Sequence, residues 1–217
     1  MQTRSGVSAK GRYLTEAFPL IPEANALGSA DRGCLEMLGG IRLSLEEKSG
    51  LIREVEGTPL RVRPTSESDI DYVLEAERNE ENRPYVGQWT QEAHVAAIGN
   101  GDMAHLILEA PGGRRVGYAI LVGIAAADGK LQLQRIVVTE KGEGYGRQAL
   151  QLLKRMAFSE FGAHRFWLRV RARNQRARRL YLSEGFVEEG TSRDSILVDG
   201  RYESIITLSI LRQEYRP

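Results

Sequence analysis

Apolar and polar residues alternate regularly from about Leu60 onward, whereas the stretch before it has no such pattern. Residues 1–57 are rich in glycine, serine, alanine and turn formers, and they keep neither the period of a strand nor that of a helix. We expect them to form a poorly ordered extension with one short helix near Ser44–Val55. Residues 58–217 are then expected to form the folded domain.

The extension raises the question of where the natural chain starts. Glu46-Glu47-Lys48 is what a purine-rich ribosome-binding site gives when it is read as protein, which would place the start near Leu51. Mass analysis of the natively expressed protein that found residues 1–50 would contradict this hypothesis. An organelle-targeting segment is disfavoured, because Glu16 and Glu23 interrupt the basic character of the stretch.

Within the folded domain, the apolar period switches between that of strands and that of helices. Ile70, Val73 and Leu74 have the i, i+3, i+4 spacing of a helix, and Thr65–Ser68 supplies an N-cap before them. Short β-branched or alternating runs between turn formers predict strands. The pattern predicts strands at 60–64, 103–109, 116–124, 131–138, 164–170, 186–189 and 202–211, and helices at 70–77, from about 91, at 145–161 and at 174–183. We therefore expect a mixed α/β fold.

Composition narrows the class of protein. The chain has 217 residues, of which 41% are apolar, and a mean hydropathy of −0.35, as in an ordinary globular domain. The net charge of +1 argues against general attraction to nucleic acid or acidic membranes. The single cysteine, Cys34, excludes an internal disulfide, and no apolar run approaches the roughly 18 residues of a membrane span. We expect a cytoplasmic protein that does not contact membranes.

The three histidines do not predict a metal site. His94, His105 and His164 lack the spacing of metal ligands and have no cysteine nearby. We expect His164, at the start of a strand, to be structural.

Residues 131–147, LQLQRIVVTEKGEGYGR, carry the strongest candidate for chemistry. An apolar strand ends at Val138, and Gly142, Gly144 and Gly146 then lead into a helix that opens near Tyr145. The first N–H groups of a helix have no partner inside it, and the helix dipole makes that end partly positive. Glycines remove the side chains that would keep a phosphate from those amides. The pattern predicts an anion cradle.

Spacing tests which phosphate ligand the cradle accepts. No lysine followed by serine or threonine comes after the second glycine, so the turn is not a P-loop. It reads G-x-G-x-G, whereas the dinucleotide fingerprint needs G-x-G-x-x-G. The acidic ribose partner expected about 20 residues later is replaced by Arg169 and Arg171, so an NADP-binding protein stays an alternative.

Two blocks resemble one family. Lys141–Gly146 is similar to the Q/R-x-x-G-x-G/A signature of the GNAT superfamily of acetyl-CoA-dependent N-acetyltransferases, with lysine in the first position. Asn174–Phe186, NQRARRLYLSEGF, resembles the family's N-x-x-A-x-x-L-Y-x-x-x-G-F segment, and the two blocks have the family's usual separation. The tail, Asp199–Tyr215, is similar to the branch with ribosomal-protein and diamine acetyltransferases. The resemblance covers about 60–215 and leaves residues 1–57 unexplained.

The resemblance implies a fold and an activity. The fold would be α/β of the GNAT type, a mixed and mostly antiparallel sheet of six to seven strands with helices on both faces. The activity would be acetyl transfer from acetyl-CoA to a primary amine by direct attack, since the chain has no suitably placed cysteine or Ser-His pair for an acyl-enzyme. Polyamines, small-molecule amines and protein N-termini all remain open as acceptors, and a homodimer remains open too.

It also implies a cofactor site. The strand before the turn would present its backbone to the pantetheine arm, and the amides of the turn would take the pyrophosphate, with Lys141 and Arg147 adding charge. The residues concerned are Ile136, Val137, Val138, Lys141, Gly142, Gly144, Tyr145, Gly146 and Arg147.

Asn174 and Tyr181 would complete that site. They are seven residues apart and therefore lie on one face of a helix. By the resemblance, Asn174 would bond the cofactor arm, and Tyr181 would protonate the departing thiolate, a transfer that ordinary phenol and thiol pKa values allow. The structural alternatives are a helix N-cap for Asn174 and a core aromatic for Tyr181.

The general base is unassigned. The attacking amine must be neutral, yet a primary amine with a pKa near ~10 is mostly charged at neutral pH. Related proteins often carry glutamate where this chain has Gln132, which cannot act as a base. Arg169 stands where relatives often have aspartate, which weakens the transfer of the diamine substrate. Either water carries the proton or another carboxylate does so, and the candidates are Glu77, Glu80, Glu81 and Glu109.

The segment Asn82–Thr90 falls where the family shapes its acceptor site. Tyr85 and Trp89 are candidates for an aromatic wall, with Gln132 as a third acceptor-site residue, and Glu80 and Glu81 for attracting a cation. The alternative is a loop anchored by two aromatics.

A binding module is the second class of hypothesis. The arginines of Arg165–Arg179, with Phe166 and Trp167 among them, are compatible with an RNA surface. In a strand, Phe166, Leu168 and Val170 would share one face and leave the arginines on the other. The low net charge argues against RNA binding, and retention on an RNA column without affinity for acetyl-CoA would support it.

Overall fold

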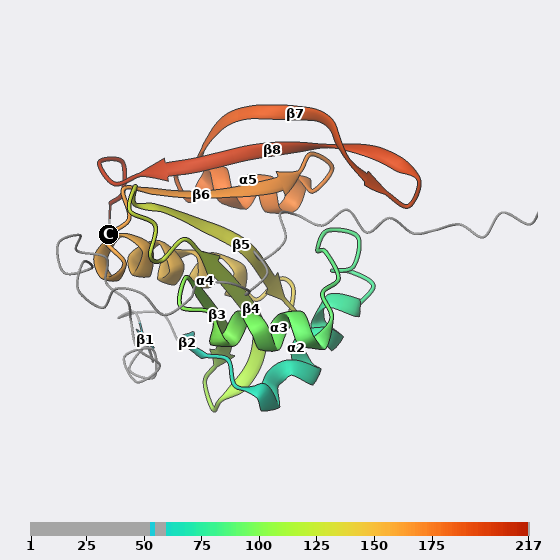
Figure 1. Cartoon of the computed structure of the whole chain (residues 1–217), viewed down its shortest axis with the longest axis vertical. Helices are drawn as coiled ribbons and strands as arrows, with labels where there is room; N and C mark the ends of the chain where they lie inside the picture. The colour runs from blue at the N-terminus through green and yellow to red at the C-terminus, as the bar shows by residue number, and fades with distance from the viewer. Residues whose placement is uncertain (1–52, 55–59, 217) are drawn as a thin grey trace, which may run out of the picture.

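Pairing of short apolar strands produces one mixed sheet of eight strands (Figure 1) in residues 53–54 and 60–216, the parts of the chain that the computed structural model describes. The strand order is β1-β2-β3-β4-β5-β6-β8-β7. Every neighbouring pair is antiparallel except β5 and β6. The strands are β1 Arg53–Glu54, β2 Arg61–Pro64, β3 Met103–Ala110, β4 Arg114–Val122, β5 Lys130–Val138, β6 Arg165–Arg171, β7 Val187–Val198 and β8 Arg201–Leu211. The expected mixed, mostly antiparallel sheet is confirmed.

Two strands differ from the expectation. β1 adds a two-residue strand beyond the six or seven predicted, so a helix is wrong at Arg53–Glu54; the rest of the predicted segment Ser44–Val55, like the proposed start near Leu51, lies outside the described residues. β7 continues to Val198, well past the predicted 186–189. Its further residues are almost all exposed, because β7 is the edge strand of a hairpin and shows no buried face to mark it in the sequence.

Helices cover both faces of the sheet, as expected. The helical segments are η1 Glu67–Asp69, α2 Ile70–Arg78, α3 Gln91–Gly99, α4 Tyr145–Arg155, η2 Met156–Glu160 and α5 Gln175–Ser183. The predicted helix at 145–161 is therefore α4 continued by the π-helical η2. In Figure 1, α2 and α3 lie together, and the β7–β8 hairpin, orange to red, reaches past the end of β6.

The two faces carry separate cores. We call the first the α4 face, where Leu150, Leu153 and Phe158 pack with Phe166, Leu168 and Val170 of β6. We call the second the α2 face, where Val73 and Ala76 of α2 and Ala97 of α3 pack with Ile107, Tyr118, Ile120 and Val137. The predicted facing of Phe166, Leu168 and Val170 is confirmed, so the other residues of β6 point toward the α2 side of the sheet.

A β-bulge in β5 changes which side chains face which core. Leu121 pairs with Leu133 and Ile120 pairs with Arg135, so Gln134 is the extra residue. Before the bulge, Leu131 and Leu133 face the α4 side. After it, Arg135 and Val137 are the residues turned toward the α2 side, where Val137 joins the core. The bulge thereby places a charged side chain beneath α2.

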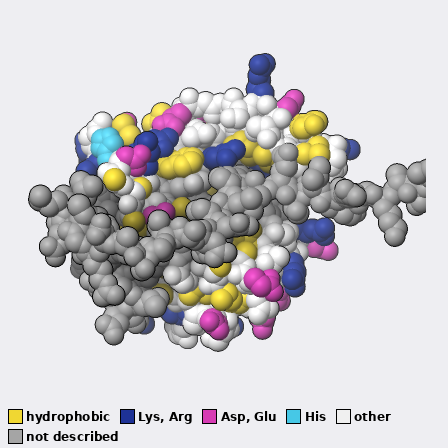
Figure 2. All heavy atoms as spheres, in the orientation of Figure 1, with side chains coloured by type: hydrophobic (Ala, Val, Ile, Leu, Met, Phe, Trp, Pro, Cys, Tyr) yellow, Lys and Arg dark blue, Asp and Glu magenta, His cyan; other side chains and the backbone are white. Residues whose placement is uncertain are grey.

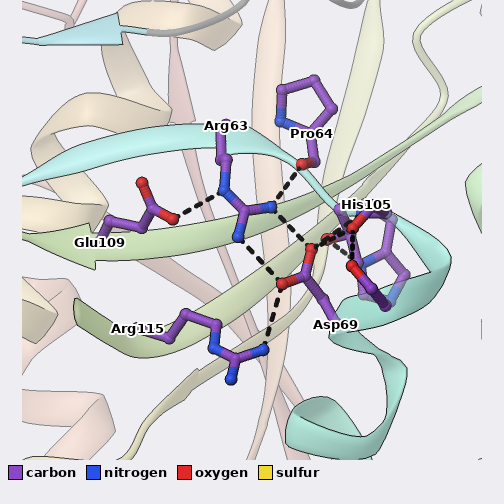
Figure 3. A network of polar contacts seen from close by, with 9 residues as sticks. Arg63, Pro64, Asp69, His105, Glu109 and Arg115 are labelled. Atoms are coloured by element: carbon purple, nitrogen blue, oxygen red, sulfur yellow. Dashed lines mark hydrogen bonds and ion pairs between the residues drawn. The ribbon is translucent and has the colours of Figure 1, made fainter. Parts of the chain in front are cut away.

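An ion-pair network fastens the start of α2 to the sheet (Figure 3). Arg63 binds Asp69 at 2.7 Å and Glu109 at 2.7 Å, and Arg115 reaches Asp69 at 3.3 Å. Burial of Asp69 raises its pKa, but hydrogen bonds from Arg63 and Ser66 outweigh this and hold the pKa well below its usual range. The network joins η1 to β2, β3 and β4, and so sets where α2 begins.

Candidate active site

β5 and β6 separate part way along their length. Their parallel pairing covers only Lys130–Leu133 and Arg165–Leu168. Beyond it, β5 stays paired with β4 as far as Val138, and β6 stays paired with β8 as far as Arg171. One edge of β5 after the bulge therefore has no strand beside it among the described residues. Such an edge offers alternate N–H and C=O groups to an extended ligand.

A cavity of about 740 Å³ lies where the two strands diverge. One wall is formed by residues 132–138 of β5 and the turn into α4. The opposite wall is formed by the end of β6 and one side of α5, as far as Tyr181. Residues 81–82 and 85–87, between α2 and α3, close the α2 side. The volume is that of a pocket for a cofactor or substrate of substantial size.

Two of the three predicted backbone contacts on β5 point to the open edge. Thr139 N–H donates to the carbonyl of Val116 at 2.9 Å, so the peptide groups of Thr139 and, by alternation, of Val137 face β4. Those of Ile136 and Val138 therefore face the cavity, although the Val138 carbonyl already accepts from Lys141 Nζ at 2.6 Å. The role of Ile136 and Val138 stays a prediction, and Val137 is directed elsewhere.

The glycine turn has the geometry of an anion cradle. Gly142 has φ +95° and Gly144, the N-cap of α4, has φ +78°, backbone that favours glycine. Gly146 serves packing, because a Cβ there would lie 3.4 Å from Leu180 of α5. Within the described part of the chain, the N–H groups of residues 141–144 donate to no acceptor. They are thus available to an anion at the positive end of α4.

The predicted cations of the turn are engaged with the protein. Lys141 Nζ contacts the side chain of Asn82 as well as Val138, and burial followed by the nearby Arg176 lowers the pKa of Lys141. Arg147 donates to Glu184 at 2.8 Å. Arg176, near the start of α5, lines the cavity, and none of the described residues accepts a hydrogen bond from it. In the sequence it belongs to the basic stretch Arg165–Arg179, two residues after Asn174.

Asn174 and Tyr181 both line the cavity, as the helical spacing predicted. The Asn174 side chain accepts from Ala177 N–H at 3.1 Å and is the N-cap of α5. Asn174 is therefore a helix cap, the structural alternative, and a cavity residue at the same time. Tyr181 is 7% exposed and its ring packs near Phe186, with centroids 5.9 Å apart. Burial raises the pKa of Tyr181 to about 12, which keeps its hydroxyl protonated at physiological pH.

On the acceptor side, Gln132 and Tyr85 line the cavity and Trp89 does not. The Trp89 ring instead lies under the Arg135 guanidinium, 4.2 Å from ring centroid to Cζ. Arg173 lies over the Tyr85 ring at 5.5 Å. An aromatic wall that includes Trp89 stays a prediction. In the structure, the Trp89 ring packs against the Arg135 guanidinium.

Among the four candidate bases, only Glu81 lines the cavity. Glu77 is 1% exposed and its carboxylate is occupied by protein donors, and Glu109 is held by Arg63. Glu80 is exposed. Of the predicted candidates, Glu81 therefore remains beside water. Glu140, which the sequence analysis did not name as a base, also lines the cavity and is held by Arg114.

Gln134 and Arg135 are cavity residues that the sequence did not single out. The Gln134 side-chain oxygen is buried and has no hydrogen-bond partner among the described residues. Arg135 Nη1 donates to Glu77 Oε1 at 2.5 Å and also contacts the Gly87 carbonyl. The bulge determines where both side chains lie, and the pattern of apolar and polar residues in the sequence does not reveal it.

A chain of hydrogen bonds runs behind Glu77. His94 Nδ1 and His105 Nε2 are 3.0 Å apart, and His105 Nδ1 lies 2.8 Å from Thr65 Oγ1. Burial, followed by the electrostatic influence of His94 and of Arg135, lowers the pKa of His105 to about 3. The described residues hold no group of three side chains suited to a metal ion.

This histidine gives the protein a pH-dependent stability. Because His105 stays neutral when folded and titrates near ~6.5 when unfolded, the unfolded chain binds the extra proton and stability falls as pH drops from about 6.5 toward about 3. Between pH 7.5 and 5.0 the loss should be about 2 kcal/mol. Urea unfolding of the wild type and of His105→Gln at both pH values checks this, since the variant should show a correspondingly smaller difference. An equal pH difference in both proteins would contradict it.

Gly117 lets β4 pair closely with the end of β5 whose other edge is open to the cavity. A Cβ at this position would lie 2.2 Å from the Val137 carbonyl oxygen and 3.1 Å from Val138 Cα. Gly117→Ala should therefore displace β5, lower the free energy of unfolding by about 1–3 kcal/mol and weaken acetyl-CoA binding. Gly190→Ala in β7, where nothing lies within 4 Å, is the matched control. Calorimetric titration and urea unfolding of both variants test the prediction, which fails if the two behave alike.

Several arginines of the basic stretch Arg165–Arg179 form ion pairs within the protein. Arg165 contacts Glu189, Arg173 lies 2.9 Å from Glu203, and Arg178 contacts Glu188. On the face seen in Figure 2, basic and acidic side chains are interspersed. These contacts weaken the case for an RNA surface. Nor does the described part of the chain contain a helix with the length and apolarity of a membrane span.

The fold and the site together are those of one acetyltransferase family. The features concerned are the mixed sheet, the divergence of β5 and β6, and the glycine turn. Residues 60–187 match the acetyltransferase (GNAT) domain family, more than half of the chain. The chain therefore belongs to the GNAT acetyltransferases, and the predicted family and fold are confirmed.

Relatives and solved structures agree with this. The chain is 29% identical over 101 residues to the spermidine N(1)-acetyltransferase of Vibrio cholerae, covering 46% of this chain and 58% of the relative. It is 39% identical over 80 residues to an uncharacterized N-acetyltransferase of Mycobacterium tuberculosis, covering 36% and 50%. The chain thus spans between half and three fifths of the curated relatives it matches. The crystal structure of the Vibrio cholerae spermidine N-acetyltransferase with CoA and spermine superposes with a TM-score of 0.67 at 21% identity, covering 72% of this chain and 98% of that one, and shares the fold.

Proposed function

We propose that this protein transfers the acetyl group of acetyl-CoA to a primary amine by direct attack. The observation that carries the proposal is the alignment of three features along one cavity: the unpaired N–H groups of residues 141–144, the open edge of β5 and the buried hydroxyl of Tyr181. They match, in order, the phosphates, the amide-bearing arm and the thioester of acetyl-CoA. The family and the CoA-bound neighbour support the choice of donor.

The residues would divide the work as follows. The turn amides and Arg176 bind the phosphates, and Ile136 and Val138 hydrogen-bond the arm, so that the thioester lies beside Tyr181. Acetyl-CoA supplies an activated carbonyl. The amine nitrogen forms the new C–N bond and loses a proton to water or Glu81, the C–S bond breaks, and Tyr181 donates its proton to the sulfur and regains one from solvent. The products are an N-acetyl amine and CoA with a free thiol.

The substrate class and the setting are also part of the proposal. The relatives are named as N-acetyltransferases, which supports an amine as the acceptor. One of them is named for spermidine. We place the activity in residues 58–217, a range that contains the family match, and in the cytoplasm, in keeping with the single cysteine.

Thiol release from acetyl-CoA tests the proposal. The purified full chain is incubated with acetyl-CoA and a panel of primary amines, and free thiol and acetylated amine are both quantified, the latter by mass spectrometry. Because the chain carries a thiol of its own, that of Cys34, a sample without amine gives the baseline. We expect amine-dependent release of one thiol per acetylated amine. Absence of release with every amine, together with absence of acetyl-CoA binding by calorimetry, would contradict the proposal.

A further inference from the structure

The acceptor end of the cavity carries a surplus of positive charge. Since Phe166, Leu168 and Val170 face α4, Arg169 and Arg171 of β6 face the α2 side. The bulge turns Arg135 of β5 toward the same side, and the adjacent chain after β6 adds Arg173. All four arginines line the cavity: Arg135, Arg169, Arg171 and Arg173.

Two carboxylates behind the wall offset part of this charge. Glu77 pairs with Arg135, and Glu203 lies 3.8 Å from Arg171 and 2.9 Å from Arg173. Neither carboxylate lines the cavity. The acidic residue that does line this side, Glu81, is close enough to Lys141 to influence its pKa, and Lys141 is itself a cation. The described acceptor end thus keeps more guanidinium and ammonium groups than carboxylates.

The arginines keep donors for a further anion. Arg171 and Arg173 both donate to the Pro84 carbonyl, at 2.6 and 2.7 Å, which fixes them against the 79–90 loop. A guanidinium has five N–H donors, so these contacts leave several on each side chain. Two neighbouring guanidinium groups held in place form a geometry that suits the two oxygens of a carboxylate.

We propose that the acceptor is a primary amine that also carries a carboxylate, of the amino-acid type, held by Arg171 and Arg173. The inference rests on the acetyltransferase function proposed above and names its substrate class. A polyamine brings two or more ammonium groups to a wall with surplus positive charge, which is electrostatically unfavourable. A carboxylate-bearing amine instead pairs with the wall while its nitrogen extends toward the thioester.

The same charge helps to explain a site with Gln132 in place of a carboxylate base. Nearby cations disfavour the ammonium form of a bound amine and so lower its pKa. More of the amine is then neutral and able to attack, and water is a sufficient proton acceptor. A positively charged acceptor end is therefore consistent with a glutamine at position 132.

Pairs of amines that differ only in the carboxylate test this directly. We would compare free amino acids with their amides, for example leucine with leucinamide, and include spermidine and putrescine. The expected result is a kcat/KM about 10-fold or more higher for the amino acid than for its amide, and still lower values for the polyamines. An equal or higher kcat/KM for the amide or for a polyamine would overturn the inference and leave the acetyltransferase function intact. No acetylation of any amine would instead contradict that function.

Variants then assign the carboxylate site. Arg173→Gln, at a half-exposed position, should raise KM for the amino acid about 10- to 100-fold with little change in kcat, and should alter kcat/KM for the amide less than about threefold. Arg171→Gln should act in the same way, provided that urea unfolding shows a folded protein. Arg201→Gln, exposed in the β7–β8 hairpin, is the control and should match the wild type. Equal losses for amino acid and amide in Arg173→Gln would show a general structural effect and overturn the assignment.

Discussion

Replacing Tyr181 with phenylalanine should lower turnover by about 10²- to 10⁴-fold while acetyl-CoA affinity changes little. The range is that of a general acid in the transition state. Tyr181 lines the cavity, and burial raises the pKa of its hydroxyl to about 12, so the proton is available over the whole physiological range. Phenylalanine keeps the ring against Phe186 and removes only the donor. Turnover is measured from acetylated amine under saturating substrates, and affinity by calorimetry.

Tyr202→Phe supplies the matched control for this substitution. Tyr202 is 69% exposed on β8, so the same chemical change there should leave turnover unaffected. Turnover of Tyr181→Phe equal to that of the wild type would remove the general-acid role and leave Tyr181 as a core aromatic. A parallel loss of affinity and stability would assign it a packing role as well.

Replacing Glu77 with glutamine should lower the free energy of unfolding by about 3–5 kcal/mol, the usual cost of leaving one member of a buried ion pair without its partner. Glutamine keeps the size of the side chain, so no cavity confounds the result. Its amide cannot compensate the Arg135 cation at 2.5 Å while also accepting from the Tyr118 hydroxyl and the Trp89 N–H. Urea unfolding at pH 7.5 gives the free energy.

Two comparisons separate this effect from ordinary loss of a contact. Glu109→Gln breaks the more exposed pair with Arg63 and should cost about 1 kcal/mol or less. Glu77→Gln combined with Arg135→Met removes both charges and should be more stable than Glu77→Gln alone. Should Glu77→Gln unfold at the same urea concentration as the wild type, Arg135 would have to be compensated by another group. Because Arg135 also lines the cavity, the single variant should lose acceptor affinity too.

Local signals in the sequence predicted the elements that are proposed to bind the donor. The turn before α4 was recognisable because Gly142 and Gly144 need positive φ, and helical spacing alone placed Asn174 and Tyr181 on one side of α5. The strands with a buried face were found within a few residues. β7 was not, since an exposed edge strand is polar on both faces.

The acceptor side was the part that local patterns could not predict. Gln134 and Arg135 take their positions from a bulge, which depends on the pairing of β5 with β4 rather than on the composition of either strand. Trp89 was predicted to be part of an aromatic wall or to anchor a loop, but in the structure the Arg135 guanidinium packs on its ring. Which of four glutamates reaches the cavity likewise depended on tertiary contacts. Long-range pairing determines such features, and a single sequence does not display it.

The short β5–β6 pairing has a mechanical consequence for the whole sheet. Four residue pairs, from Lys130–Arg165 to Leu133–Leu168, are the only strand pairing between the half-sheet β1–β5 and the half-sheet β6–β8–β7 in the described chain. A molecule hydrogen-bonded to the free edge of β5 and to the start of α5 would link the two half-sheets and restrict their movement relative to each other. Ligand binding should then slow amide hydrogen exchange around the cavity. It should also slow exchange along β6 and β8, which belong to the half-sheet on the other side of the β5–β6 pairing.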